Sequence, residues 1–155
     1  MAKLSGFSPI ITTASPRNEA HLKALGAMHV LDRSLPLPTA LAELARLTEG
    51  APIAYAYDAV SHPDTQELAY RALAPGGRLL LVTPDRVPKE LKAEGDGKKV
   101  VTVWGSVHLP QNRKVGVEMY KRLTEWLETG VVVVRSKFSF LLTKVCSFAM
   151  RSPTT

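Results

Sequence analysis

The sequence predicts an α/β domain of the doubly wound type, built on a mostly parallel sheet. Short apolar runs alternate with amphipathic segments along the chain, which is typical of βαβ units. The chain has 155 residues, 45% of them hydrophobic and 22% charged, with a net charge of +6. This length suits about one domain, and the composition is that of a folded globular protein.

The first predicted unit is a strand, a helix and a second strand. Residues 9–14 are rich in β-branched side chains, which favours a buried strand. Ser15 and Pro16 predict a helix start, because serine caps helices and proline suits the first turn. Gly26 ends that helix, and residues 29–32 form the next strand. Three side chains of the helix are expected to face the sheet: Ala20, Ala24 and Leu25.

The remaining elements continue the alternation. Asp58, near the end of the third strand, is interpreted as a buried cap of the next turn or as a ligand contact. Tyr55 and Tyr57 are expected to be core residues on one face of the sheet. Gly76 and Gly77 are predicted to form a turn. Strands are predicted at 53–60, 78–83 and 99–107, and helices at 39–48, from 61–64 to 75–77, and at 112–129.

The pattern breaks after Gly130. A short strand at 131–134 and an amphipathic helix over 138–149 are both compatible with the apolar spacing there. The last 25 residues carry +4 and no acidic residue, while the first 130 carry only +2. Because the charge is not a basic stripe on the folded body, nucleic acid is not expected as a partner. No transmembrane helix is predicted.

The carboxyl ends of parallel strands are the places where such sheets bind ligands. After the first strand, Ser15, Arg17 and Asn18 offer hydrogen-bond donors, and an arginine suits the 2′-phosphate of NADP. The alternative is that Ser15 is only a cap and Arg17 a solvated surface residue. Arg33, after the second strand, is interpreted as part of the same pocket or as a loop charge. The isolated loop histidine His62 is expected to be exposed, as is His108.

Several motifs are absent from the sequence. It contains no G-x-G-x-x-G, no G-x-x-x-x-G-K-[ST] and no G-x-S-x-G. With one cysteine and four histidines, no cysteine-based zinc site is expected, and no metal is predicted.

The run I-I-T-T-A-S-P-R-N-E-A-H-L-K-A-L-G-A followed by H-V-L-D-R resembles the cofactor domain of medium-chain dehydrogenases/reductases, from its second strand onward. Y-D-A-V-S and A-P-G-G-R-L-L-L-V-T extend the likeness, which is greatest to the zinc-independent enoyl-reductase branch. It covers roughly residues 2–130. The resemblance implies a partial Rossmann-type sheet that lacks the first strand and the glycine-rich loop. Since that strand is central in the order 3-2-1-4-5-6, its neighbours must close the gap or keep unpaired edges.

The resemblance also implies roles for individual residues. Ser15, Arg17 and Asn18 would meet the 2′-phosphate end of NADPH, with Arg33 near the adenine. Farther along the chain, Val60 and Ser61 would lie near the nicotinamide half, and Thr83 on the substrate side. No catalytic residue is identified.

We therefore expect residues 1–130 to be a partial dinucleotide-binding domain and 131–155 a divergent basic tail, in an incomplete or altered gene product. The expected function is that of a cofactor-binding fragment of an NADPH-dependent enoyl or carbonyl reductase, weak or inactive alone. Whether it is an enzyme by itself is left open, and a small-molecule substrate is expected only in a complete chain. The alternative is a non-catalytic interaction module whose tail binds a partner or a membrane surface. A cytoplasmic protein is expected, and homo-oligomers are left open.

Overall fold

The computed structural model describes residues 2–93, 95–133 and 146–150. The chain forms two compact units, each described by itself. The larger contains residues 2–103 together with the strand at 146–150, and the smaller begins at Trp104. None of the described helices combines the length and apolar character needed to cross a membrane.

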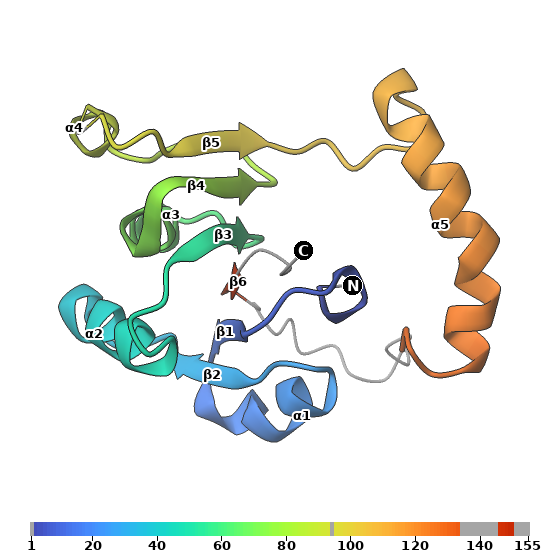
Figure 1. The fold of residues 1–155 in the computed structure, drawn as a ribbon, viewed down its shortest axis with the longest axis horizontal. Coiled ribbons are helices and arrows are strands. Elements are labelled where there is room, and N and C mark those ends of the chain that lie inside the picture. Colours follow the sequence, from blue (N-terminus) through green and yellow to red (C-terminus); the bar gives the residue numbers. More distant parts are fainter. Residues whose placement is uncertain (1, 94, 134–145, 151–155) are drawn as a thin grey trace. The chain divides into compact units, whose positions relative to one another are not determined.

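The larger unit is built on a six-stranded sheet in the order β2-β1-β6-β3-β4-β5. Neighbouring strands are parallel throughout, except that β6 runs antiparallel to both β1 and β3 (Figure 1). The mostly parallel α/β architecture predicted from the sequence is therefore confirmed. The strands are β1 (Ile10–Ala14), β2 (His29–Asp32), β3 (Ile53–Asp58), β4 (Leu73–Leu81), β5 (Lys99–Thr102) and β6 (Cys146–Met150).

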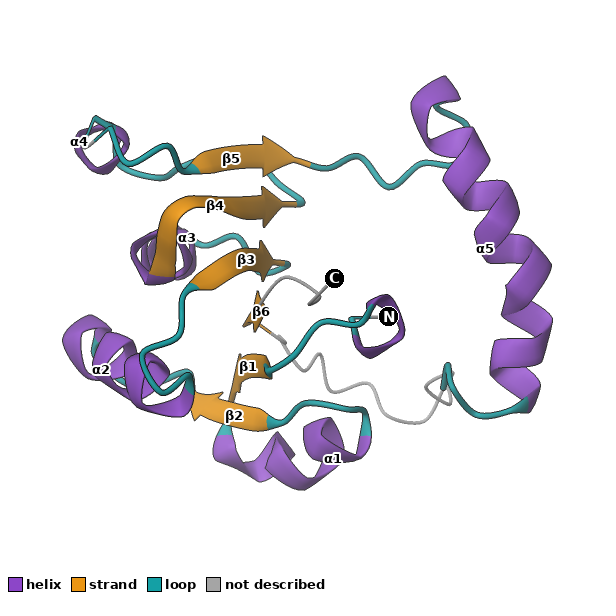
Figure 2. Ribbon diagram, viewed as in Figure 1, coloured by secondary structure: helices purple, strands orange, loops and turns teal. Residues whose placement is uncertain are grey.

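Helices connect the parallel strands of this unit (Figure 2). A 3-10 turn, η2 (Pro16–Asn18), and α1 (Glu19–Ala24) link β1 to β2. Three further helices follow in order: α2 (Leu37–Leu47), α3 (Pro63–Ala72) and the short α4 (Lys89–Lys92). A proline lies in the first turn of both α2 and α3, where a missing N–H loses no helical hydrogen bond. The unit also contains η1 (Lys3–Ser5), and the smaller unit contains α5 (Pro110–Glu128).

The core of the larger unit is apolar and lies where α2, α3 and α4 pack against the sheet. Leu79 and Leu81 of β4 are fully buried at its centre. The neighbouring core residues are Ile11, Leu31, Ala40, Leu44, Ile53, Ala56, Ala69, Tyr70, Leu73, Val87 and Leu91. Burying an aliphatic side chain of this kind stabilises the fold by about 1.5–3 kcal/mol, so this cluster holds the carboxyl ends of the strands in place.

The first helix differs from its prediction. Residues 16–18 form a 3-10 turn, and the α-helix begins only at Glu19. Its buried residue is Leu22, while the three side chains expected to face the sheet are exposed: Ala20, Ala24 and Leu25.

Other local predictions also need correction. Gly76 and Gly77 lie within β4 as an irregularity in its pairing with β3, rather than in a separate turn. Tyr55 and Tyr57 are only half-buried and lie outside the core cluster. Tyr55 instead stacks edge-on against Phe7, with ring centroids 5.5 Å apart.

The C-terminal region departs most from expectation. Residues 131–133 form no strand, and Cys146–Met150 is a strand where the apolar spacing had indicated a helix; the rest of that predicted helix lies outside the described residues. The edges of β1 and β3 are neither joined nor left open, because β6 pairs with both. Ala149 is opposite Ile11 on one side and Ala56 on the other. Without β6, the facing edges of β1 and β3 would leave backbone N–H and C=O groups unpaired in the centre of the sheet. Pairing with β6 satisfies these groups.

Candidate functional site

The carboxyl ends of β1 and β2 bring the first group of predicted residues together. Ala14 and Asp32 are register partners at the ends of these two parallel strands. Directly beyond them, the Arg33 backbone N–H donates to the Ala14 carbonyl at 3.1 Å. The turn that carries Ser15, Arg17 and Asn18 therefore lies beside the loop that carries Arg33.

The side chains of this turn are available for binding. Arg17 and Arg33 are exposed, and within the described ranges neither forms an ion pair. Ser15 occupies the N-cap position of the 3-10 turn, as predicted, but its side chain makes no capping hydrogen bond. Asn18 at the start of α1 makes no side-chain cap either. This end of the site presents two guanidinium groups, which are well suited to anions.

The acidic group at this end is already occupied. The Asp32 carboxylate accepts hydrogen bonds from the Ser34 backbone N–H at 2.9 Å and from its hydroxyl at 2.8 Å. These bonds, and the positive charge of Arg33, lower the pKa of Asp32 below its ordinary value. Asp32 is thus ionised at neutral pH and directed at its own loop.

A second group of residues lies at the carboxyl ends of β3 and β4, where Asp58 and Leu81 are register partners. Asp58 is fully buried. Its carboxylate accepts hydrogen bonds from the backbone N–H of Val60 at 2.9 Å and of Ser61 at 2.8 Å, and from the Thr65 hydroxyl at 2.7 Å. The interpretation of Asp58 as a buried cap is confirmed: it holds the loop in which Val60 and Ser61 lie.

The loop after β4 lies beside this one and contains Thr83. The Thr83 hydroxyl oxygen is buried and has no hydrogen-bond partner in the described structure. Buried polar atoms are nearly always paired, so this unpaired hydroxyl just beyond the carboxyl end of β4 is an exception.

The strand β6 separates these two groups and was not found from the sequence. In the sheet order it lies between β1 and β3, and the register places Cys146 opposite Thr13 near the carboxyl end of β1. A short apolar run fits a buried strand and a helix segment equally well by periodicity. The sequence pointed to this position only through the gap that a missing central strand leaves between β1 and β3. That gap involves segments far apart in the chain, so the pattern of residues 146–150 alone does not show it.

The two loop histidines are the remaining candidates. His62 is exposed, and its Nδ1 accepts a hydrogen bond from the Asp64 backbone N–H at 3.4 Å as the cap of α3. His108 is exposed in the smaller unit. Across the residues that the structure describes, no group of three or more His, Cys, Asp or Glu side chains could hold a metal ion.

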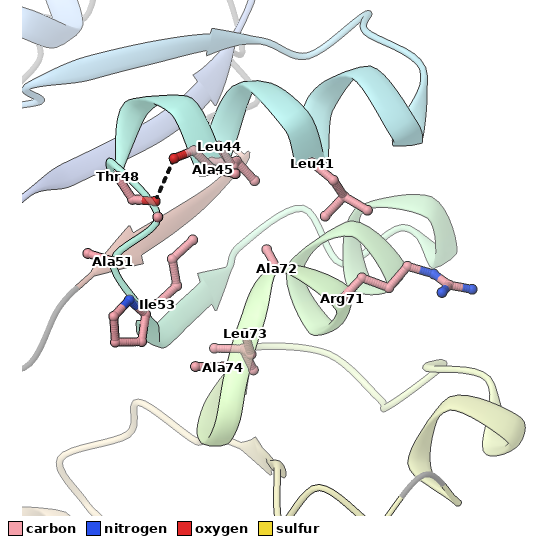
Figure 3. A pocket seen from close by; sticks show the side chains of 12 residues that line it. Leu41, Leu44, Ala45, Thr48, Ala51, Ile53, Arg71, Ala72, Leu73 and Ala74 are labelled. Carbon is pink, nitrogen blue, oxygen red and sulfur yellow. Dashed lines mark hydrogen bonds between the residues drawn. The ribbon is translucent and has the colours of Figure 1, made fainter.

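An apolar pocket of about 340 Å³ lies away from the carboxyl ends of the strands. It is formed where the last turn of α2 leads into β3 and where α3 ends, as Figure 3 shows. Leu41 and Leu44 line one side, Ile53 and Leu73 the other, and Arg71 lies at its rim. Helices return from the carboxyl to the amino ends of parallel strands, so this pocket is at the opposite edge from the candidate site.

Comparison with known proteins identifies the family. A family described as zinc-binding dehydrogenase matches residues 1–128. A zinc-type alcohol dehydrogenase-like protein from Schizosaccharomyces pombe is 29% identical over 151 residues, covering 86% of this chain and 40% of that protein. A trans-enoyl reductase from Penicillium crustosum is 38% identical over 87 residues, covering 56% of this chain and 23% of its own.

Solved structures agree with this result. A quinone oxidoreductase from Pseudomonas syringae superposes with a TM-score of 0.65 at 26% identity, covering 81% of this chain and 39% of that one. A mycobacterial protein solved in complex with NADPH gives a TM-score of 0.60 at 26% identity, over 81% of this chain and 40% of that one. The chain spans about 40% of the length of the curated relatives that match most of it.

Proposed function

Because the chain belongs to the zinc-binding dehydrogenase family, we propose that it is the NADPH-binding part of an oxidoreductase of the enoyl- or carbonyl-reductase type. Its α/β sheet is the Rossmann-like NAD(P)-binding type of medium-chain dehydrogenases/reductases. Relatives include trans-enoyl reductases and a quinone oxidoreductase, and one related structure was solved with NADPH. Substrate and activity belong to the proposal, since the chain spans only part of its relatives' length.

The observation that carries this proposal is the pair of unpaired arginines at the ends of β1 and β2. In a dinucleotide-binding sheet, an acid at this edge binds the ribose 2′-hydroxyl of NAD, whereas an arginine accommodates the 2′-phosphate of NADP. Asp32 accepts hydrogen bonds from Ser34, whereas Arg17 and Arg33 form no ion pair with any described residue. We assign Arg17, with Ser15 and Asn18, to the 2′-phosphate, and Arg33 to the adenine side.

The loops after β3 and β4 would receive the other half of the cofactor. Val60 and Ser61 would border the nicotinamide, and Thr83, with its unpaired buried hydroxyl, would face the substrate side. When bound, NADPH supplies the hydride that reduces an activated double bond or a carbonyl. The chain's own residues would bind and orient it, and we assign no catalytic acid among those described. We therefore expect little or no turnover from this chain alone.

The family's name mentions zinc, but the described residues do not fit that ion. They contain no group of three or more His, Cys, Asp or Glu side chains that could hold a metal ion, and the proposal assigns no step to a metal.

The test of this proposal is a calorimetric titration of the protein with NADPH and NADH. Hydrogen bonds to charged groups contribute about 1.5–3 kcal/mol, so NADPH should bind about tenfold tighter than NADH or better. Arg17→Ala should remove most of that preference, and Arg17→Lys should keep part of it. Arg46→Ala is the control, because Arg46 is paired with Glu43 at 2.6 Å in the last turn of α2, toward the opposite edge.

Equal affinity of the unsubstituted protein for the two nucleotides would refute the assignment of the 2′-phosphate site. An Arg17→Ala variant that keeps the full preference would move the site away from Arg17. Measurable reduction of an enone by the purified chain would show that the expected lack of turnover is wrong.

A further inference from the structure

We propose that Gln66 is a positioning residue that joins the loop after β3 to the loop after β4, so that the two loops act as one preorganised half of the site. This rests on the proposed function, in which those loops receive the nicotinamide half of NADPH. Gln66 itself would not touch the cofactor, because it is fully buried within α3.

The Gln66 side chain forms hydrogen bonds with backbone groups of both loops. Its Oε1 accepts from the Arg86 N–H at 2.7 Å, and its Nε2 donates to the Pro84 carbonyl at 3.1 Å. The same Nε2 lies 3.5 Å from the Ser61 carbonyl oxygen. One buried amide therefore contacts Pro84 and Arg86, which are 18 and 20 positions away in the loop after β4, and Ser61 in the loop after β3.

The loop after β3 is fastened from two sides by this arrangement. Asp58 accepts from the Ser61 N–H, and Gln66 donates to the Ser61 carbonyl. Between these two bonds, Ser61 has a φ of +56°, a left-handed conformation that a serine rarely adopts. Such backbone costs on the order of 1–3 kcal/mol and persists only where the surroundings over-determine it. The buried carboxylate and the buried amide provide that over-determination.

The loop after β4 depends on the same amide. Gln66 binds backbone groups of Pro84, which directly follows Thr83 and its unpaired buried hydroxyl, and of Arg86, three residues after Thr83. A change at Gln66 would therefore release both Ser61 and Thr83 from fixed positions, and the ordering of both loops would then have to occur on binding. Preorganisation of this kind raises affinity by removing that ordering cost.

The experiment compares two ligands on the full chain: NADPH, and 2′,5′-ADP, which carries only the 2′-phosphate end. Gln66→Leu has nearly the same volume but cannot make the three contacts. We expect it to weaken NADPH about tenfold, while the affinity for 2′,5′-ADP changes less than twofold. Gln111→Leu, the same substitution at an exposed position, is the control and should change neither affinity. A purely structural role for Gln66 would lower thermal stability but keep the ratio of the two affinities.

A second measurement needs no variant, in case Gln66→Leu does not fold. Hydrogen exchange of the unsubstituted protein should show the amides of Ser61 and Arg86 protected together, and NADPH should protect both further while 2′,5′-ADP protects neither. Independent exchange of the two amides, or an unchanged affinity ratio in Gln66→Leu, would overturn the role of Gln66 and leave the proposed function standing. Failure of 2′,5′-ADP and NADPH to bind at all would overturn both.

Discussion

β2 and β3 both end on an aspartate, and the two ends of the candidate site differ in how that aspartate is used. Asp32 accepts from the Ser34 N–H at 2.9 Å, and Asp58 accepts from the Val60 N–H at 2.9 Å, each two residues along the chain. Asp58 is fully buried and binds a second amide and a hydroxyl as well. Asp32 is partly exposed, and among the described residues its carboxylate accepts hydrogen bonds from Ser34 alone.

The difference between Asp32 and Asp58 indicates two ways in which the proposed binding residues are held at the carboxyl edge of the sheet. At the ends of β1 and β2, Arg17 and Arg33 are exposed charges that need little support, since long-range attraction tolerates side-chain freedom. At the ends of β3 and β4, the groups expected to meet the ligand belong to the backbone and to small hydroxyl side chains. These must be placed to within a fraction of an ångström, which explains the dense buried network of Asp58, Thr65 and Gln66.

The largest effect is expected from breaking the strand that stands between the two ends. Ala149→Pro removes a backbone N–H of β6 and adds a ring in the middle of the sheet, so it should destabilise the larger unit by about 3 kcal/mol or more. Ala149→Ser keeps the N–H and similar volume, and it should unfold within a few degrees of the unsubstituted protein. Thermal unfolding followed by circular dichroism distinguishes the two. Equal melting of both variants would show that β6 does not hold β1 and β3 together.

A smaller loss of stability is expected from replacing each of the two aspartates, Asp58 and Asp32, with alanine. Asp58→Ala leaves the buried N–H groups of Val60 and Ser61 without an acceptor, at about 1–3 kcal/mol for each buried unsatisfied group. Asp32→Ala leaves groups that water can reach, so its loss of stability should be much smaller. Urea unfolding of both variants measures the difference. The contrast between the two edges would be wrong if Asp32→Ala were the more destabilising substitution.

The smallest effect concerns two threonines of the buried edge. Thr83→Val removes a hydroxyl that has no partner in the described structure, so it should stabilise the ligand-free protein by about 1 kcal/mol. Thr65→Val makes the same change where the hydroxyl bonds to Asp58 at 2.7 Å, and it should destabilise by a similar amount. Calorimetric melting temperatures should therefore move in opposite directions. A loss of stability in both would mean that the Thr83 hydroxyl is paired.

The local sequence pattern was sufficient to predict those elements whose conformation depends mainly on their own residues. The apolar run of β1, the proline-led start of α3, and the buried aspartate near the end of β3 could each be predicted without knowledge of the rest of the chain. The position of the proposed binding residues just beyond the carboxyl ends of the strands could be predicted as well, since it depends only on strand direction.

The tertiary structure decided what depends on partners far along the chain. β6 could not be predicted, because a short apolar run is compatible with a helix or a strand until the open edges of β1 and β3 are known. The side of α1 that is buried carries Leu22, whereas Leu25, which was expected to face the sheet, is exposed. Gln66 looked like an ordinary helix residue, since its partners Pro84 and Arg86 lie 18 and 20 residues away. Strand pairing and buried hydrogen bonds are satisfied across the whole fold, so sequence spacing alone does not contain them.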